Sequence, residues 1–520
     1  MTTCFVLMSL CFAGAAEPVD PPSRLAARID ELIEAPFAER KIVAAPPSDD
    51  AEFLRRISID LIGQIPSEKE VREFLVDPSS SKRGELIDRL LKDPRHFEHF
   101  AHSWRALLLP EAESDLQVDY FRPGLEAWLR ERREKNMPFN AIVRDLLSVP
   151  ISDSRTAPEM VIRDLRRPNP LGYFAAKDAK PENLAASATR LFLGVRLECA
   201  QCHDHPFGHW TQKQFWNQAA FFAGLERQGK GVFSPIIESR GLREIPVMQT
   251  STSAPPLFLD GKPPELAVDK SPRTAFAEWL TSVENTQFAK ATVNRVWGQL
   301  LGLGLVDPVD DFHAGNLPSH PELLDELTTR FIESDFDLSM LIAAICRTRA
   351  YQRTSRLTDP SQEENRTFAK MAVKQMAAEQ FVDSLLAAVG TPRDADALRN
   401  GRNRDPLQQQ LLDLFSSGDK LSDPQSSILQ ALALMNGRMV SDAAVEQKSP
   451  TLQSLFERSS EPASAKIDAL YLATLSRFPT ESERAKLVDY LAVNESKELS
   501  RRLGDVLWVL LNSVEFGCNH

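Results

Sequence analysis

The residues Cys199-Ala200-Gln201-Cys202-His203 form the pattern with the most definite chemistry in this sequence. In a Cys-x-x-Cys-His pattern, each thiol can add to a vinyl group of haem. The imidazole beside the second thiol can then serve as an axial ligand of the iron. The spacing therefore predicts a covalently bound haem c, with Cys199 and Cys202 as attachment points, His203 as iron ligand, and an electron-transfer role.

The same segment also supports hypotheses without haem. Histidines follow at positions 205 and 209, so Cys199, Cys202, His205 and His209 offer four ligands for a tetrahedral zinc site. Such a site would suit a non-redox binding or assembly protein. In an exported protein the two cysteines could instead form a disulfide, and they could also be two thiols without a special role.

A second group of polar residues lies in the other half of the chain. Asp307, Asp310 and Asp311 fall within five positions and precede His313. Three carboxylates at this spacing could hold a hard cation such as Ca²⁺. With Arg295 they could also line the groove of a hydrolytic enzyme that acts on extracellular polymers. The simpler interpretation is a loop whose carboxylates pair with arginines.

The composition limits the classes of function. The chain has 520 residues, 42% of them hydrophobic and 26% charged, which is typical of a soluble globular protein with more than one domain. The formal net charge of -12 argues against a general nucleic-acid binder, because phosphates need a positive field. No stretch reaches the roughly 18 apolar residues that suggest a membrane span. We expect an unknown redox or cell-surface protein as the partner.

The first sixteen residues predict an export signal. An apolar run from Cys4 to Phe12 leads into Ala13-Gly14-Ala15, a small-x-small cleavage pattern, although no Lys or Arg precedes the run. The mature protein is therefore expected in the periplasm, secreted or at the cell surface. Export suits the haem hypothesis, because covalent attachment of haem is normally completed outside the cytoplasm.

Helical patterns dominate the rest of the sequence. Capping boxes at Ser67-x-x-Glu70, Ser319-x-x-Glu322 and Thr480-x-x-Glu483 predict helix starts, and an apolar periodicity predicts a helix from 182 to 199. Short apolar runs separated by Gly and Pro predict extended structure or strands over 229–269. The predicted fold is mainly α: after the signal at 1–16, two helical domains, 25–228 and 270–520, are joined by the segment 229–269.

Several longer motifs resemble a known family. In the first half they are residues 55–66 (RRISIDLIGQIP), 193–196 (LGVR) and 199–207 (CAQCHDHPF); in the second half they are 291–297 (ATVNRVW), 304–312 (GLVDPVDDF), 318–324 (PSHPELL) and 430–436 (QALALMN). The sequence is similar to planctomycete-type secreted proteins with two domains. The resemblance implies a cytochrome-c-like N-terminal domain of unknown function that carries the Cys-x-x-Cys-His pattern. It also implies a planctomycete-specific C-terminal domain of unknown function, and it leaves the activity open.

Overall fold

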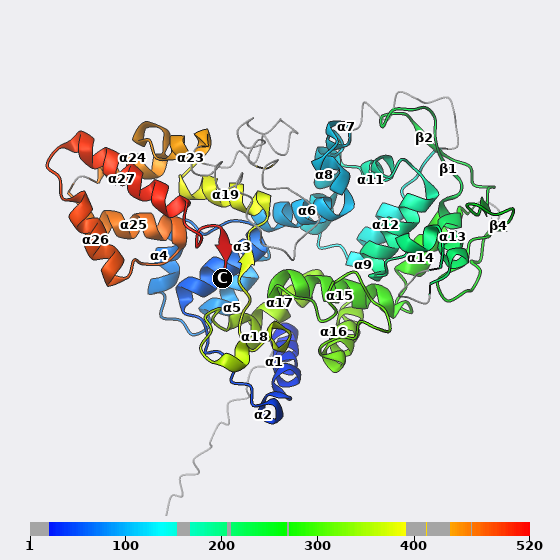
Figure 1. Cartoon of the computed structure of the whole chain (residues 1–520), viewed down its shortest axis with the longest axis horizontal. Coiled ribbons are helices and arrows are strands. Elements are labelled where there is room, and N and C mark those ends of the chain that lie inside the picture. The colour runs from blue at the N-terminus through cyan, green and yellow to red at the C-terminus, as the bar shows by residue number, and fades with distance from the viewer. Residues whose placement is uncertain are drawn as a thin grey trace, which may run out of the picture.

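The protein is mainly helical, as the sequence predicted (Figure 1). The computed structural model describes residues 20–152, 167–204, 210–267, 270–391, 412, 437–458 and 460–520. The predicted signal at 1–16 lies outside these residues. Two helical regions are separated by a short segment with small strands, which confirms the predicted fold class.

The first region runs from the N-terminal helix to the start of the strands. Its α-helices are α1 (Pro21–Glu34), α2 (Phe37–Arg40), α3 (Asp50–Ile62), α4 (Glu68–Val76), α5 (Lys82–Leu90), α6 (Pro94–Leu108), α7 (Leu116–Asp119), α8 (Arg122–Glu134), α9 (Phe139–Leu147), α11 (Leu171–Ala176), α12 (Pro181–Leu193) and α13 (Gln212–Ala219). Short 3₁₀ turns are η1 (Pro110–Glu113), η2 (Glu198–Gln201) and η3 (Ala220–Phe222).

Two small hairpins follow. Strand β1 (Leu225–Arg227) pairs antiparallel with β2 (Ile236–Glu238), with Glu226 opposite Ile237, and β3 (Ile245–Pro246) pairs with β4 (Ser253–Ala254). These strands lie within or beside the segment for which the sequence predicted extended structure.

The second region begins at residue 272. Its α-helices are α14 (Pro272–Leu280), α15 (Thr286–Leu301), α16 (Pro321–Glu333), α17 (Leu338–Arg347), α18 (Arg349–Gln352), α19 (Ala378–Ala388), α23 (Arg438–Ala443), α24 (Pro450–Glu457), α25 (Ala463–Leu475), α26 (Glu481–Leu491) and α27 (Ser496–Leu511). It also holds the 3₁₀ turns η4 (Pro360–Gln362), η5 (Asn365–Thr367) and η6 (Glu446–Lys448), and the antiparallel strands β5 (Lys374–Gln375) and β6 (Cys518–Asn519).

Two of the three predicted capping boxes are present. Ser67 caps α4 and Thr480 caps α26, each with the reciprocal glutamate contact. The box predicted at Ser319 was wrong. Helix α16 begins at Pro321, and its N-cap residue, His320, makes no side-chain capping bond. Proline has its backbone φ already set for the first helical position, so Pro321 fixes the start of the helix without Ser319.

The buried apolar side chains form two clusters. The larger contains Phe53, Phe192 and Trp297, so it combines helices from both sides of residues 229–269. Contacts of α1 with α17 and of α12 with α15 hold these helices together. The smaller cluster consists of α19 and α23–α27, joined by Ile59 and Ile65 from the first region. Helix α3 therefore contributes side chains to both clusters.

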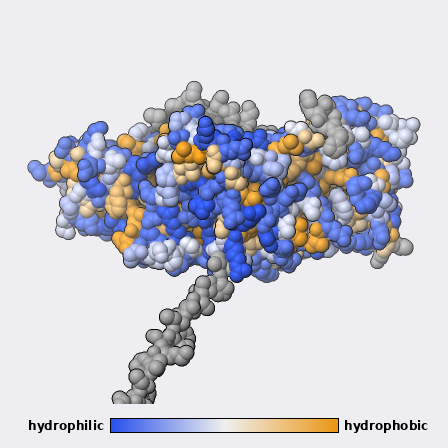
Figure 2. All heavy atoms as spheres, turned by 90° about the horizontal axis from the view of Figure 1, so that it is seen from below, coloured by the Kyte–Doolittle hydropathy of each residue, from blue (hydrophilic) through white to orange (hydrophobic). Residues whose placement is uncertain are grey.

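One face of the molecule is mostly hydrophilic. Figure 2 shows this face, on which apolar side chains form small, separate patches among hydrophilic ones. Within the part of the chain that the structure describes, no helix combines the length and the hydrophobicity needed to cross a membrane.

Candidate functional site

The helix before the Cys-x-x-Cys-His turn is shorter than the sequence predicted. Helix α12 ends at Leu193, and Gly194 follows in a left-handed conformation with φ of 65°. A Cβ atom at this position would lie 2.6 Å from the ring of Phe312, so glycine is needed for both the backbone conformation and the close packing. The predicted extension of this helix to residue 199 was therefore wrong.

The Cys-x-x-Cys-His residues lie on and just after the 3₁₀ turn η2. Cys199 and Cys202 are both exposed free thiols, so the structure contains no disulfide between them. Ala200, between them, is fully buried and anchors the turn. Trp216 on α13 donates its indole N–H to the carbonyl oxygen of Gln201, at 3.1 Å. The turn is thus fixed to the body of the protein while its two thiols face solvent.

The side chain of His203 is also exposed. Its Nδ1 lies 2.8 Å from the carbonyl oxygen of Asp204, and no described residue is bonded to its Nε2. The amide of Gln212, at the start of α13, donates to a carboxylate oxygen of Asp204 at 2.9 Å. The predicted zinc ligands His205 and His209 lie outside the described residues. Among the residues that are described, no three His, Cys, Asp or Glu side chains form a group able to hold a metal ion.

The aspartates of the predicted cation loop are not gathered around a common point. Asp310 is buried and pairs with Arg190 on α12 at 2.5 Å and with Arg196, just beyond that helix, at 2.6 Å. Asp311 lies 3.7 Å from His313, and the backbone oxygen of Asp307 accepts a hydrogen bond from Asn316. For Asp310 this arrangement corresponds to the simpler interpretation, in which arginines pair with the loop carboxylates, whereas Asp311 lies beside His313.

The Asp310 carboxylate has a direct effect on stability. Burial alone would raise its pKa, but hydrogen bonds from Arg190 and Arg196 outweigh this effect and hold the pKa below its usual value of 3.8. A lowered pKa means that the stabilisation is complete above the unfolded-state pKa and is lost as the pH falls through the folded-state pKa.

We therefore predict that Asp310→Asn lowers the free energy of unfolding near pH 7 by about 1–2 kcal/mol, allowing for the solvent exposure of both arginines. In urea unfolding experiments, the difference from the wild type should shrink at a pH of about 3. The matched control is Asp325→Asn, because Asp325 is 66% exposed in its pair with Lys290. An equal loss of stability in both variants would show that the Asp310 ion pairs with Arg190 and Arg196 do not stabilise the fold more than an exposed pair does.

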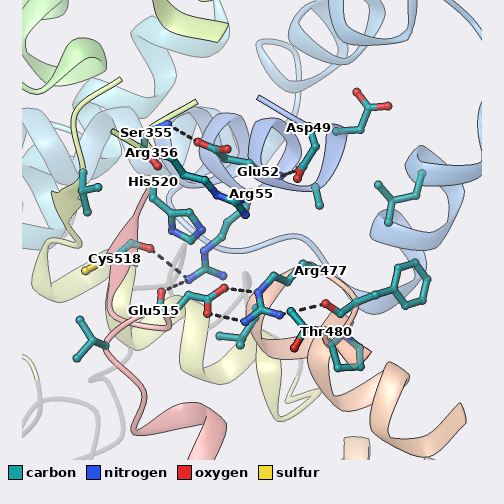
Figure 3. A pocket seen from close by; sticks show the side chains of 18 residues that line it. Asp49, Glu52, Arg55, Ser355, Arg356, Arg477, Thr480, Glu515, Cys518 and His520 are labelled. Atoms are coloured by element: carbon teal, nitrogen blue, oxygen red, sulfur yellow. Dashed lines mark hydrogen bonds and ion pairs between the residues drawn. The ribbon is translucent and has the colours of Figure 1, made fainter. Parts of the chain in front are cut away.

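A cavity of about 840 Å³ lies in a different part of the molecule. Figure 3 shows it beneath the first turns of α3, with Asp49, Glu52 and Arg55 on one side and Arg477 and Glu515 on the other. Its remaining walls come from the loop after α18 and the C-terminal residues up to His520. No sequence pattern predicted chemistry for these residues, because they come from distant segments of the chain, at 49–75, 355–373 and 475–520.

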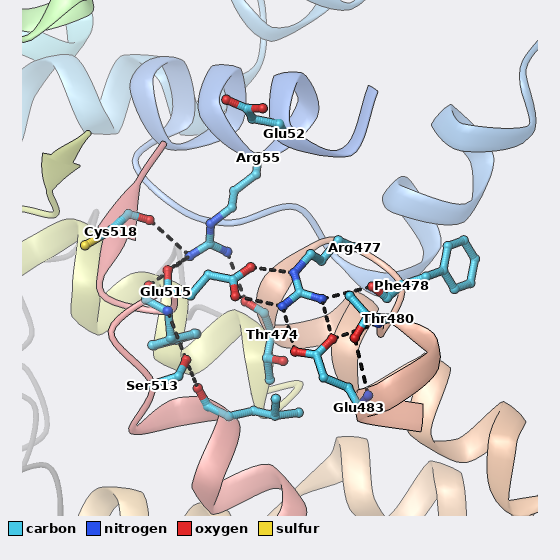
Figure 4. Close-up of polar contacts among 12 residues, drawn as sticks. Glu52, Arg55, Thr474, Arg477, Phe478, Thr480, Glu483, Ser513, Glu515 and Cys518 are labelled. Atoms are coloured by element: carbon cyan, nitrogen blue, oxygen red, sulfur yellow. Dashed lines mark hydrogen bonds and ion pairs between the residues drawn. The ribbon is translucent and has the colours of Figure 1, made fainter. Parts of the chain in front are cut away.

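Arg55 is the central charged group of this cavity. It is 1% exposed and donates to the carbonyl oxygens of Thr474 at 3.0 Å and Phe516 at 2.8 Å, with longer bonds to two more carbonyls of the C-terminal segment (Figure 4). Burial lowers its pKa to about 10, so it remains charged at neutral pH. The carboxylate of Glu515 bonds to Arg477, at 2.6 and 2.8 Å, and not to Arg55.

Two family models match the chain. Residues 28–227 match one described as "Protein of unknown function (DUF1549)", and residues 272–412 match one described as "Protein of unknown function (DUF1553)". The chain carries both domains of unknown function. No curated protein and no solved structure matches the chain significantly.

The Cys-x-x-Cys-His turn lies within one of these domains, whereas the cavity is formed by both domains and by residues beyond them. The Cys-x-x-Cys-His turn lies within the DUF1549 domain, and Asp310 of the DUF1553 domain pairs with the arginines that precede the turn. The cavity combines Arg55 of the DUF1549 domain, Arg356 of the DUF1553 domain and residues beyond position 412.

Proposed function

We propose that this protein is an exported c-type haem protein that transfers electrons to or from an unknown redox or cell-surface partner. Haem c would be attached through Cys199 and Cys202, with His203 as an axial ligand. When bound, haem c supplies a one-electron Fe(III)/Fe(II) couple. The support for this proposal comes from the exposure of the two thiols and from the hydrogen bond of the His203 ring.

The exposure of the thiols is the observation that carries the proposal. Addition of a thiol to a vinyl group needs a free sulfur that the incoming group can reach, and both cysteines meet this condition. Structural cysteines are usually buried, as Cys346 is in this protein. The anchoring of Gln201 by Trp216 keeps the turn in place without covering the sulfurs.

The imidazole of His203 is in an arrangement that suits a metal ligand. Histidines that bind metals commonly donate the N–H of one ring nitrogen to a carbonyl or carboxylate, which orients the ring and leaves the other nitrogen for the metal. The contact of Nδ1 with the Asp204 carbonyl has this form, and Nε2 is the nitrogen that would face the iron.

The test is expression of the full chain, with its export signal, in a host that attaches haem c. We expect a Soret band and haem-linked peroxidase staining at the mass of the protein after denaturing electrophoresis. The double variant Cys199→Ala/Cys202→Ala should lose the stain completely. Cys518→Ala, which removes a thiol elsewhere in the chain, should keep it. His203→Ala should disturb the visible spectrum through loss of the axial ligand.

A colourless, correctly exported protein would refute the haem proposal. If that protein also retained stoichiometric zinc, and lost it in the same double variant, the result would favour the alternative of a non-redox binding or assembly protein. In that case His205→Ala and His209→Ala should each weaken zinc binding, because each would supply one of four ligands.

A further inference from the structure

We propose that the cavity beneath α3 binds a small apolar carboxylate. This inference is independent of the haem proposal, because none of the cavity residues belongs to the Cys-x-x-Cys-His turn. It depends on three observations: the charges in the wall, the apolar side chains at the rim, and the size of the space.

The first observation is that two arginines of the wall, Arg55 and Arg356, form no direct ion pair with a described carboxylate. Three of its acidic side chains already have cationic partners: Asp50 pairs with Lys82 and Arg83, Glu52 with Arg56, and Glu515 with Arg477. In contrast, Arg55 donates its hydrogen bonds to backbone carbonyls, with the Glu515 carboxylate as a nearby counter-charge that it does not bond directly, and its buried Nε has no hydrogen-bond partner among the described residues.

Arg356 adds a second available cation. Its side chain is exposed at the cavity, and its guanidinium forms no ion pair with any described residue. Asp49 has no cationic partner among the described residues, and one of its oxygens caps α3 by accepting from the Glu52 amide at 2.8 Å. An anion in this space could accept from the unsatisfied Nε of Arg55 and would face the exposed guanidinium of Arg356, and both contacts would stabilise it.

The second observation is an apolar rim around the charged wall. Val514 is 84% exposed, Val373 is 55% exposed and Phe478 is 44% exposed, and all three line the cavity. Leu75 and Leu475 line it as well. Exposed apolar side chains that line a cavity favour a ligand that covers them. An inorganic anion would leave them in water, whereas the hydrocarbon part of an organic acid would bury them.

The third observation is the volume. About 840 Å³ is within the range of cavities that hold small organic ligands, and such sites combine apolar walls with a few polar groups that orient the ligand. Figure 3 shows how the charged side chains converge: Arg55 descends from α3 toward Glu515 and Cys518, with the ring of His520 beside it.

The experiment is calorimetric titration of the full-length protein with octanoate, 1-octanol and inorganic phosphate as probes. We expect octanoate to bind with a dissociation constant of about 1 mM or lower. The alcohol lacks the charge and phosphate lacks the chain, so each should bind at least about tenfold more weakly. Phosphate binding as tight as that of octanoate would overturn the proposal, because the site would then recognise any anion.

Substitutions of two exposed cavity residues test whether octanoate binds in this cavity. Arg356→Gln should weaken octanoate binding about fivefold. Val514→Asp places a negative charge at the rim and should weaken it at least as much. Arg240→Gln and Val283→Asp are the matched controls, because both residues are exposed and neither lines this cavity. Absence of saturable binding, or equal affinities in Arg356→Gln and Arg240→Gln, would overturn the proposal.

Discussion

Glu238→Gln is expected to lower the free energy of unfolding by about 3–5 kcal/mol, because it leaves a buried guanidinium without its counter-charge. Glu238, on β2, binds Arg273, on α14, through two hydrogen bonds of 2.5 and 3.0 Å, and both side chains are at least 94% buried. Arg273 also donates to the carbonyl oxygens of Leu147 and Val149. The pair therefore fastens the strand segment to helices on both sides of it.

Urea unfolding near neutral pH measures this loss. The control is Glu333→Gln, which removes an exposed ion pair with Arg330 on α16 and should change stability by no more than about 0.5 kcal/mol. Replacing both Glu238 and Arg273 with apolar residues should cost less than Glu238→Gln alone, because no buried charge is then left unpaired. Similar losses in the buried and exposed variants would show that the Glu238–Arg273 pair does not have this structural role.

Arg55→Met is expected to destabilise the protein by about 3 kcal/mol or more, because hydrogen bonds from a charged donor to buried carbonyls are lost together. The guanidinium joins the end of α25, through Thr474, to the C-terminal segment, through Phe516. The loss should appear in urea unfolding, and hydrogen exchange should increase in the segment from Phe516 to Asn519.

Arg55→Lys distinguishes the role of geometry from that of charge. Lysine keeps the charge but lacks the planar fork that reaches two segments at once, so it should restore only part of the lost stability. Arg24→Met on α1 is the control, since Arg24 is exposed. If the Lys variant were as stable as the wild type, charge alone would explain the effect and the bridging role would be wrong.

Local sequence signals predicted much of the secondary structure. The caps at Ser67 and Thr480 were correct because a capping box depends only on residues three positions apart. The end of α12 was missed, although Gly194 was visible in the sequence. Its importance comes from the ring of Phe312, which is distant in the chain and packs where a Cβ atom would be.

In the candidate sites, too, features that depend on neighbouring residues were predicted, and features that depend on distant residues were not. The Cys-x-x-Cys-His pattern is contiguous, so its chemistry was visible in the sequence, but the exposure of Cys199 and Cys202 was not. For Asp310, the sequence offered both a cation site and arginine partners. The choice depended on Arg190 and Arg196, which lie over a hundred residues earlier in the chain.

Residues close together in the chain were enough to predict the helical fold, two helix caps and a thiol–imidazole motif, because each of these depends on local spacing. The folded arrangement was needed to see that the motif lies exposed on an anchored turn, that Asp310 has two arginine partners, and that Arg55 lines a cavity. These features arise from packing between distant segments, where burial and charge pairing determine which polar groups are satisfied and which remain available.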